Sequence, residues 1–472
     1  HKEMTLPPSY ITSKEYVTDS LSFLKSFSMV FNNFPRDWLA YFNSLAIEDM
    51  NSLALGGFKL LFIPIEVTHL IPEFLSRFAK FLSHHRYSLN FPLKLFFTKF
   101  LKNETCPSSL KAVLHKIESL KPKLDPFSQK CAYDFSHNSG LSKKKLHEVV
   151  FFAPLIDTIC KRHNADTIID IGSGLGYLSH LLNDYFKYPV LGIECDSEKV
   201  TTAYRNQIKY FPNSRDKILK NSCIVGLHAC ADLSITILDL FTKLDFVNCL
   251  VIMPCCYHRI EFESVYGGKE YFKHFPASQL FKDMWENSEA ENFIRRPFLR
   301  LACQQSVQSF LKMTGEEHTA HARSCMHRAV LQKVVESANC NVTRLKRKSG
   351  KTRFLDADED FQAYLDNLRN THQLNYQTSS INTFDTKDER FLKMMHDTWI
   401  EQKDNCQLME VLTAFQASLQ GVCENLILLD RVEFLKEKGF KCYVQKVTDD
   451  SISPRCFALV AVKSKSDRQI NT

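Results

Sequence analysis

The chain has 472 residues, of which 44% are hydrophobic, and a formal net charge of +7 at pH 7. This length predicts a globular protein of two or three domains, and the charge permits an acidic partner without requiring one. The 16 cysteines are scattered among charged sequence with no signal peptide before them, which argues against a secreted disulfide framework. We therefore expect reduced thiols in an intracellular protein, cytoplasmic or nuclear. The longest apolar stretches are interrupted before the roughly 20 residues that span a bilayer, so no transmembrane helix and no membrane partner are predicted.

The N-terminal part of the chain is expected to be helical. Residues 1–140 carry apolar residues at helical spacings, broken by proline-containing stretches. A further helix is predicted from the Ser142 cap to about residue 163, with Pro154 expected to kink or interrupt it.

An α/β domain is predicted to begin at residue 141. From residue 167, short β-branched runs alternate with helical segments for about a hundred residues, the pattern of a mostly parallel sheet. The alternation stops after residue 258, and residues 259–405 are expected to form a mostly helical or looped insertion. Residues 406–472 then predict a long helix capped by Gly439 and two strands. Because the connection between these strands is short, they should form an antiparallel hairpin that completes the sheet.

The stretch "DIGSGLGYLS", residues 170–179, places a glycine loop between a predicted strand and a predicted helix. A dinucleotide fingerprint has the spacing G-x-G-x-x-G, but here Gly176 comes one residue early and Tyr177 stands in its place. Asp170 would also repel a pyrophosphate, whereas the sulfonium and ammonium groups of S-adenosylmethionine favour a nearby acid. The loop therefore favours S-adenosylmethionine, with a dinucleotide or a plain strand-to-helix turn as alternatives.

Glu194 ends the next predicted strand, where a carboxylate can accept hydrogen bonds from both ribose hydroxyls. The expected cofactor-binding residues are Asp170, Gly172, Ser173, Gly174, Gly176, Tyr177, Glu194, Asp196 and His228.

Two further strand ends carry histidines and cysteines, in "GLHACADLS" (226–234) and "MPCCYHRI" (253–260). The carboxyl ends of the strands form the ligand crevice of an open α/β sheet, so these side chains should converge beside the cofactor. His228 or Asp232 is a candidate general base, Tyr257 could stack on a planar acceptor, and Cys255 or Cys256 could relay a thiolate. The expected catalytic residues are His228, Asp232, Cys255, Cys256, Tyr257 and His258.

Zinc is an alternative use of the same cysteines and histidines. Adjacent cysteines do not readily bind one tetrahedral ion, and neither segment contains a C-x-x-C pair, so no metal is predicted. A structural His–Cys core beneath the site remains the other alternative.

These segments together resemble the methyltransferase-like 25 family, which includes a paralogue described as ribosomal RNA adenine dimethylase domain-containing. The motifs are "LSKKKLHEVV", "DIGSGLGYLSHLL", "GLHACADLS", "CCYH", "LACQ", "HRAVL", "LLDR" and "SPR". The resemblance implies a Rossmann-like, S-adenosylmethionine-dependent methyltransferase of class I. The two His/Cys segments are also similar to those of enzymes that methylate a ribose hydroxyl in tRNA, which raises the expectation of an RNA acceptor. Ala231 departs from the family pattern, since relatives usually carry glycine there.

The expected function is thus methylation of RNA, on a ribose hydroxyl or a base. A protein acceptor is one alternative. A non-catalytic binding module is another, supported by Ala231 and by the short interval between Glu194 and His228. Contacts to RNA, either tRNA or rRNA, are expected from a basic segment with Arg344, Lys346, Arg347, Lys348, Lys351 and Arg353, for which a solvated loop is the alternative.

Overall fold

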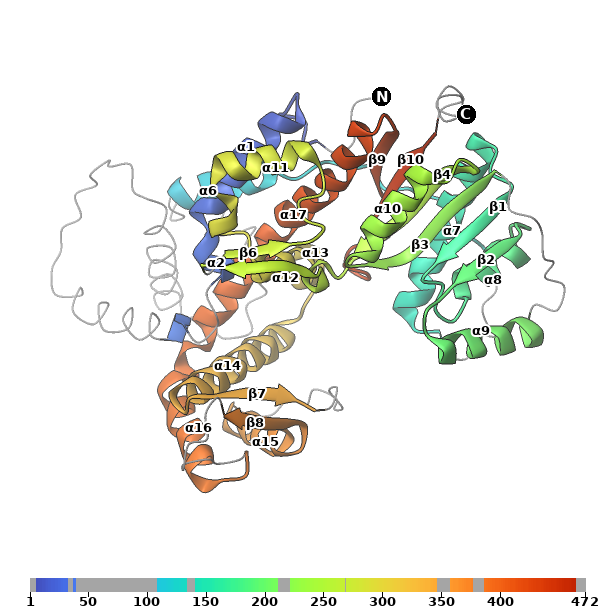
Figure 1. Ribbon diagram of the computed structural model, residues 1–472. Helices are drawn as coiled ribbons and strands as arrows, with labels where there is room; N and C mark the ends of the chain where they lie inside the picture. The colour runs from blue at the N-terminus through green and yellow to red at the C-terminus, as the bar shows by residue number, and fades with distance from the viewer. Residues whose placement is uncertain are drawn as a thin grey trace. The chain divides into compact units, whose positions relative to one another are not determined.

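The computed structural model describes residues 6–32, 37–39, 108–133, 141–210, 221–267, 269–345, 357–376 and 386–463 (Figure 1). The chain divides into two compact units. Unit 1 comprises residues 1–25, 112–310 and 417–472, and unit 2 comprises residues 26–111 and 311–416. Among the described residues, none of the helices combines the length and the apolar character needed to cross a lipid bilayer.

Unit 1 is built on a six-stranded sheet in the order β2-β1-β3-β4-β10-β9. The strands β1 (Thr167–Ile171), β2 (Val190–Ile193), β3 (Ser222–Cys230) and β4 (Val247–Cys255) are parallel. The last two, β9 (Lys441–Lys446) and β10 (Phe457–Val462), form an antiparallel hairpin, and β10 pairs antiparallel with β4. The predicted Rossmann-like sheet, mostly parallel with a C-terminal hairpin, is confirmed.

Helices cover both faces of this sheet (Figure 1). The side chains of Cys223 and Val225 lie in a buried core with residues of α7 (Lys143–His163) and α8 (Tyr177–Asp184). The next residue, Gly226, faces the other way, toward Ile237 of α10 (Leu233–Lys243). This alternation follows from the two-residue period of a strand, and it explains why both faces of the central strands are apolar.

The helix α7 runs continuously through Pro154, so the proline does not interrupt it. Proline lacks an N–H group, so the carbonyl oxygen four residues earlier, on Val150, loses its helical partner. The N–H group of Cys131 donates to that oxygen at 2.9 Å. An external donor therefore replaces the missing hydrogen bond, and the buried proline is tolerated inside the helix.

The long helix α17 (Cys406–Glu437) and its cap agree with the sequence pattern. Gly439 has a left-handed φ of 87°, and the N–H group of Phe440 donates to the carbonyl oxygen of Leu435. Only glycine adopts this backbone conformation without a steric penalty, so Gly439 ends the helix as predicted.

The remaining elements of unit 1 either precede β1 in the chain or lie between β4 and β9. They are α1 (Ser13–Ser26), α6 (Ser108–Ser119), the short 3₁₀ turn η2 (Tyr257–Arg259), β5 (Phe262–Tyr266), β6 (Lys269–Phe272), α11 (Gln279–Ser288), η3 (Ala290–Asn292), α12 (Arg296–Ala302) and α13 (Val307–Leu311). The strands β5 and β6 form an antiparallel hairpin.

In its described residues, unit 2 contains helices and one pair of antiparallel strands. Its elements are α2 (Ser28–Asn32), α14 (Gly315–Ser337), β7 (Cys340–Arg344), α15 (Ala357–Thr371), β8 (His372–Tyr376), α16 (Glu389–Gln402), η4 (Lys403–Asn405) and the beginning of α17. The strands β7 and β8 pair antiparallel.

The unit boundaries differ from the expected division at residues 140, 258 and 405. Residues 259–310 belong to unit 1 together with the sheet, and the predicted insertion carries two pairs of antiparallel strands besides its helices. In the expected N-terminal helical region the described parts contain α1, α2 and α6, and residues 40–107 lie outside the described residues.

Candidate functional site

The glycine loop is a tight turn between β1 and α8. Gly172, Gly174 and Gly176 have left-handed φ values of 76°, 58° and 79°. A Cβ atom on Gly176 would lie 2.9 Å from Nε2 of His180. The turn therefore needs glycine for its backbone conformation, and at Gly176 also for space.

Glu194 fastens the end of β2 to this turn. Its Oε2 atom accepts a hydrogen bond from the N–H group of Gly174 at 2.9 Å. Its Oε1 atom accepts from the N–H groups of Cys195 and Asp196 at 3.0 and 3.1 Å. Burial alone would raise the pKa of Glu194, but these hydrogen bonds outweigh it and hold the pKa below its usual value. An ionised carboxylate thus lies directly against the glycine turn.

Asp170 provides a second acid beneath the turn. Its side chain is buried, and its Oδ2 atom accepts a hydrogen bond of 2.6 Å from the hydroxyl of Ser179 on α8. Burial raises the pKa of Asp170 to about 6, and the negative charge of Glu194 adds to the effect. Ser179 lies inside the glycine-rich stretch, but its role as the partner of Asp170 was not predicted.

Two of the expected cofactor-binding residues have structural roles. Oδ1 of Asp196 accepts hydrogen bonds from the N–H groups of Glu198 and Lys199, so Asp196 caps the helix α9 (Ser197–Tyr210). The ring of Tyr177 packs against the core beneath α7 and α8.

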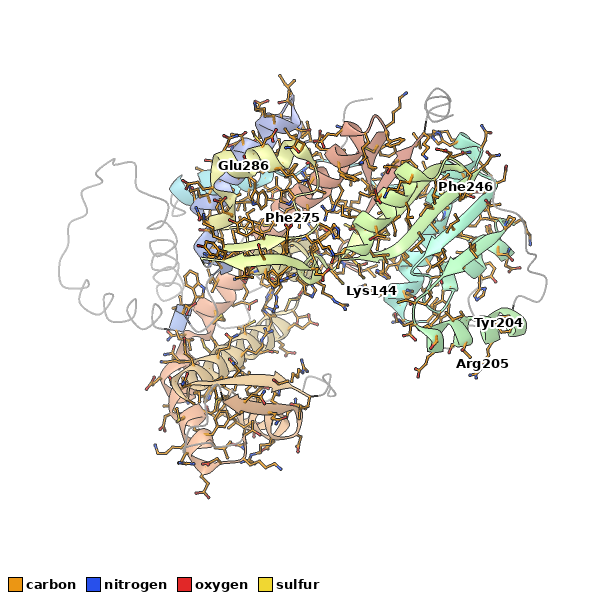
Figure 2. All side chains as sticks on the ribbon, viewed as in Figure 1. Lys144, Tyr204, Arg205, Phe246, Phe275 and Glu286 are labelled. Carbon is orange, nitrogen blue, oxygen red and sulfur yellow. The ribbon has the colours of Figure 1, made fainter. Side chains whose placement is uncertain are left out.

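His228 is held by a residue from the beginning of α7. Its Nε2 atom lies 3.1 Å from Oε2 of Glu148, and Oε1 of Glu148 accepts a hydrogen bond of 2.7 Å from Ser453. Burial would raise the pKa of Glu148, but its hydrogen bonds with His228 and Ser453 lower it overall. The ammonium group of Lys144, labelled in Figure 2, lies 3.7 Å from Oε1 of Glu148. Three of the motifs that carry the family resemblance therefore meet here.

Asp232 is engaged on both carboxylate oxygens. Oδ1 lies 2.7 Å from Nδ1 of His274, and Oδ2 accepts a hydrogen bond of 2.9 Å from the N–H group of Glu261. These contacts fasten the segment that carries β5 and β6 to the start of α10. The residues that hold Asp232 follow it by 29 and 42 positions, and nothing in their own pattern indicates this contact. Among the described residues, Nδ1 of His228 has no hydrogen-bond partner, whereas both carboxylate oxygens of Asp232 are engaged.

Tyr257 is buried with only 1% of its surface exposed, which corrects the expectation that it stacks on an acceptor. Its hydroxyl is directed toward the carbonyl oxygen of Pro254 and toward Glu424, at 3.3 and 3.4 Å. Burial is the main reason that its pKa lies above the usual range. The ring of Tyr257 is therefore part of the protein core and has no face open to a ligand.

His258 lies at the same strand end and is half-buried. Its Nδ1 atom is 3.0 Å from the sulfur of Cys303, in the motif "LACQ". Burial lowers the pKa of His258, and the positive charges of Arg300, Arg259 and Arg296 lower it further.

The cysteines of the two strand ends converge as predicted. Cys230 and Cys255 are paired in register on β3 and β4, and their sulfurs are 2.9 Å apart. The sulfur of Cys256 joins them, so that all three lie within 4.8 Å of one another.

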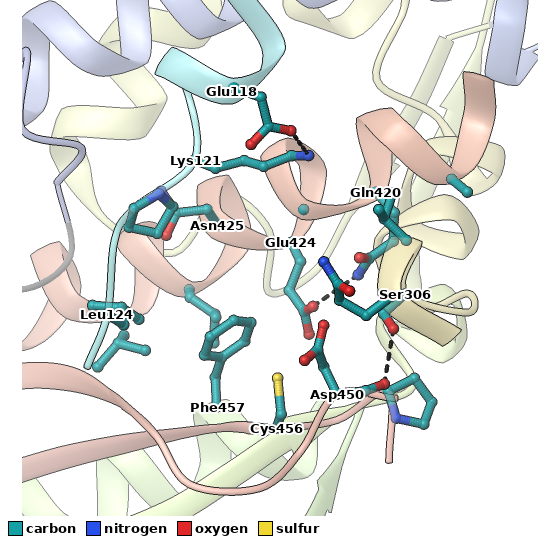
Figure 3. Close-up of a pocket in the computed structure, with 18 residues that line it drawn as sticks. Glu118, Lys121, Leu124, Ser306, Gln420, Glu424, Asn425, Asp450, Cys456 and Phe457 are labelled. Atoms are coloured by element: carbon teal, nitrogen blue, oxygen red, sulfur yellow. Dashed lines mark hydrogen bonds and ion pairs between the residues drawn. The ribbon is translucent and has the colours of Figure 1, made fainter. Parts of the chain in front are cut away.

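A cavity of about 200 Å³ lies elsewhere in unit 1, between α6, α17 and the C-terminal hairpin (Figure 3). Glu424 forms part of its wall and is bonded to Gln420, as the figure shows. None of the residues predicted from the sequence as cofactor-binding or catalytic lines this cavity.

The basic segment expected to contact RNA is described only at its start. Arg344 is exposed at the end of β7, whereas Lys346, Arg347, Lys348, Lys351 and Arg353 lie outside the described residues.

Residues 144–263 match the family model of a methyltransferase domain, Methyltransf_32. This range contains the glycine turn, Glu194, His228 and both cysteine-bearing strand ends. Together with the fold, the match defines the class of the domain as a Rossmann-like methyltransferase.

The chain is also similar to curated proteins. It is 25% identical over 259 residues to probable methyltransferase-like protein 25 of Homo sapiens, a match that covers 53% of this chain and 38% of that protein. It is 24% identical over 256 residues to the same protein of Mus musculus, with the same coverage of each chain. The domain and these relatives support a methyltransferase family like that of methyltransferase-like protein 25, as the motifs predict.

Proposed function

We propose that this domain transfers methyl groups from S-adenosylmethionine to RNA. The observation that carries the proposal is the contact between Glu194 and Gly174, which joins an ionised carboxylate to the glycine turn with Asp170 buried below. Two acids beside the turn disfavour a pyrophosphate and suit a cofactor with a sulfonium and an ammonium group.

The residues present fit such a cofactor. Glu194 would accept the ribose hydroxyls in place of its present backbone donors, and the backbone of Gly172 and Gly174 would lie against the methionine part. When bound, S-adenosylmethionine supplies an electrophilic methyl group on a positively charged sulfur. The remaining task of the protein is to align the acceptor and to remove its proton.

His228 is the proposed proton acceptor. Its side chain is 32% exposed, and Glu148 holds its Nε2 atom. When Nε2 carries the proton that is shared with Glu148, Nδ1 is the nitrogen that takes a proton from an acceptor hydroxyl. The charge of Glu148 also stabilises the imidazolium that results.

The charges around the strand ends favour a polyanionic acceptor. Lys143 and Lys144 are exposed in the first turn of α7, and Lys144 lies beside the Glu148 that holds His228. Arg259 and Arg300 are exposed near His258. Lysine and arginine contacts to phosphates position a nucleic acid without reading its sequence.

Two measurements on the full chain test this proposal. Calorimetric titration with S-adenosylmethionine and with S-adenosylhomocysteine should give saturable binding to one site. Incubation with methyl-labelled cofactor and with total RNA or total protein from cells lacking the gene should label the RNA. Saturable binding with label only in protein would contradict the RNA acceptor, and binding without any transfer would indicate a non-catalytic module. No binding at all would overturn the cofactor.

A further inference from the structure

Three sulfurs meet at the carboxyl ends of β3 and β4. The sulfurs of Cys230, Cys255 and Cys256 all lie within 4.8 Å of one another. Cys255 is buried, whereas Cys230 and Cys256 are half-buried, so the cluster reaches the surface on one side. The methyl-transfer chemistry proposed above uses none of these thiols.

The backbone explains how two adjacent cysteines contribute to one cluster. Consecutive side chains of a strand point to opposite faces, which would separate the sulfurs of Cys255 and Cys256. Cys256, however, leaves the strand in a left-handed conformation, with φ 52° and ψ 40°. This turn of the backbone brings its side chain to the same side as Cys255.

A second left-handed residue lies next to the third cysteine. Ala231 has φ 51°, and its N–H group donates to the carbonyl oxygen of Cys255 at 2.8 Å. Left-handed residues other than glycine are costly and are concentrated at functional sites. The two strand ends are therefore tied together directly at the sulfur cluster.

We propose that Cys230, Cys255 and Cys256 bind a zinc ion through three thiolates, with the fourth position open to solvent. A tetrahedral zinc ion with Zn–S bonds of about 2.3 Å places its sulfurs about 3.8 Å apart. The observed separations bracket this value, because one pair is 2.9 Å apart and no pair exceeds 4.8 Å. Each thiol loses a proton to solvent as the metal binds, and no electron transfer is involved.

The surrounding charge suits this site. Three thiolates around a divalent ion leave one net negative charge, and the positive charge of Arg259 acts on both Cys230 and Cys256. Because Arg259 is exposed and Cys230 and Cys256 are only half-buried, an ion can reach the sulfurs from solvent.

A second group of three cysteines in the same unit provides a matched control. The sulfurs of Cys160, Cys223 and Cys249 are also within 4.8 Å of one another, but all three residues are fully buried in the apolar core between the sheet and α7. An ion there would leave an uncompensated charge in an apolar surrounding, which is costly. We therefore assign the metal to the strand-end cluster and expect the core cluster to remain as thiols.

Cobalt titration of the reduced, metal-free full chain tests the assignment. We expect one equivalent of Co²⁺ to give thiolate-to-cobalt charge-transfer absorption that Zn²⁺ displaces. Cys256→Ser should weaken the binding at least about tenfold, whereas Cys223→Ser in the core cluster should leave the stoichiometry unchanged.

Alkylation of the unmodified sequence gives a test that does not depend on the folding of a variant. Zn²⁺ should protect Cys230, Cys255 and Cys256 from N-ethylmaleimide, as read by peptide mass spectrometry. The assignment is overturned by the absence of charge-transfer absorption or by protection confined to the core cluster.

Discussion

Nε2 of His228 lies 3.1 Å from Oε2 of Glu148, although the two residues are 80 positions apart in the chain. His228 stands near the end of β3, and Glu148 is buried in the second turn of α7. Their contact joins the strand ends to the helix that covers the sheet, and it gives the half-buried histidine a fixed orientation.

Glu148→Gln should lower methyl transfer while leaving the cofactor bound. The amide keeps the size of the side chain but removes the charge that stabilises the histidine as an imidazolium. We expect kcat to fall about tenfold to a hundredfold, part of the 10²–10⁴-fold that a general base contributes. Single-turnover methylation measures the loss. Glu286→Gln replaces an exposed glutamate of α11, labelled in Figure 2, and should leave kcat unchanged. Equal rates for Glu148→Gln and the unmodified protein would remove His228 from the proposed role.

Glu194→Ala should weaken cofactor binding more than it weakens the fold. The carboxylate now accepts hydrogen bonds from three backbone N–H groups, which water can replace because Glu194 is not fully buried. Losing hydrogen bonds between the carboxylate and the ribose should cost about 1.5–3 kcal/mol, or about tenfold to a hundredfold in Kd. Calorimetry with S-adenosylhomocysteine measures this loss, and thermal unfolding measures the stability. Glu198→Gln, on the exposed first turn of α9, is the control. An unchanged Kd would place the ribose elsewhere.

The sheet and the glycine turn could be predicted because they depend on local sequence. Alternating β-branched and helical segments define the parallel strands, and the glycines at residues 172–176 mark positions that require left-handed φ values. The partners of the polar site residues could not be predicted in this way. Glu148 reaches His228, and Glu261 reaches Asp232, only because the tertiary packing brings distant segments together.

The burial of Tyr257 also could not be predicted from the local sequence. A tyrosine at a strand end can face a ligand or the core, and its local sequence does not distinguish the two. Here the choice is made by Glu424 on α17 and Arg455 before β10, which together form a buried polar network beneath Tyr257. Arg455 of the motif "SPR" thus stabilises the fold around the site.

Breaking the pair of Glu424 and Arg455 should destabilise unit 1 strongly. Nη1 of Arg455 lies 2.5 Å from Oε1 of Glu424, and the guanidinium group also donates to the carbonyl oxygens of Ala302 and Gln304. Arg455→Met leaves a buried glutamate without its cation and should cost about 3–5 kcal/mol in the free energy of unfolding. The double variant with Glu424→Leu should lose less than the sum of the single variants, because neither charge is then left alone. Urea unfolding of all four proteins measures this coupling. Strictly additive losses would contradict it.

Asp170→Asn should change how the stability depends on pH. Burial raises the pKa of Asp170 in the folded protein to about 6, from a usual value of 3.8. The folded state therefore holds the proton more tightly than the unfolded state, so this group favours folding below pH 4. That contribution is lost as the pH rises through 6, and the difference corresponds to about 3 kcal/mol at most.

The asparagine variant lacks this titration. Between pH 4 and pH 7 its free energy of unfolding should therefore rise relative to that of the unmodified protein. Urea unfolding at one-unit pH steps measures the two curves, and Asp239→Asn on α10, a partly exposed aspartate paired with Lys243, serves as the control. Saturating S-adenosylmethionine should reduce the difference, because a bound cation near Asp170 lowers the pKa of its carboxyl group. Parallel curves without cofactor would show that Asp170 does not titrate in this range. A difference that the cofactor leaves unchanged would mean that its cationic groups bind away from Asp170.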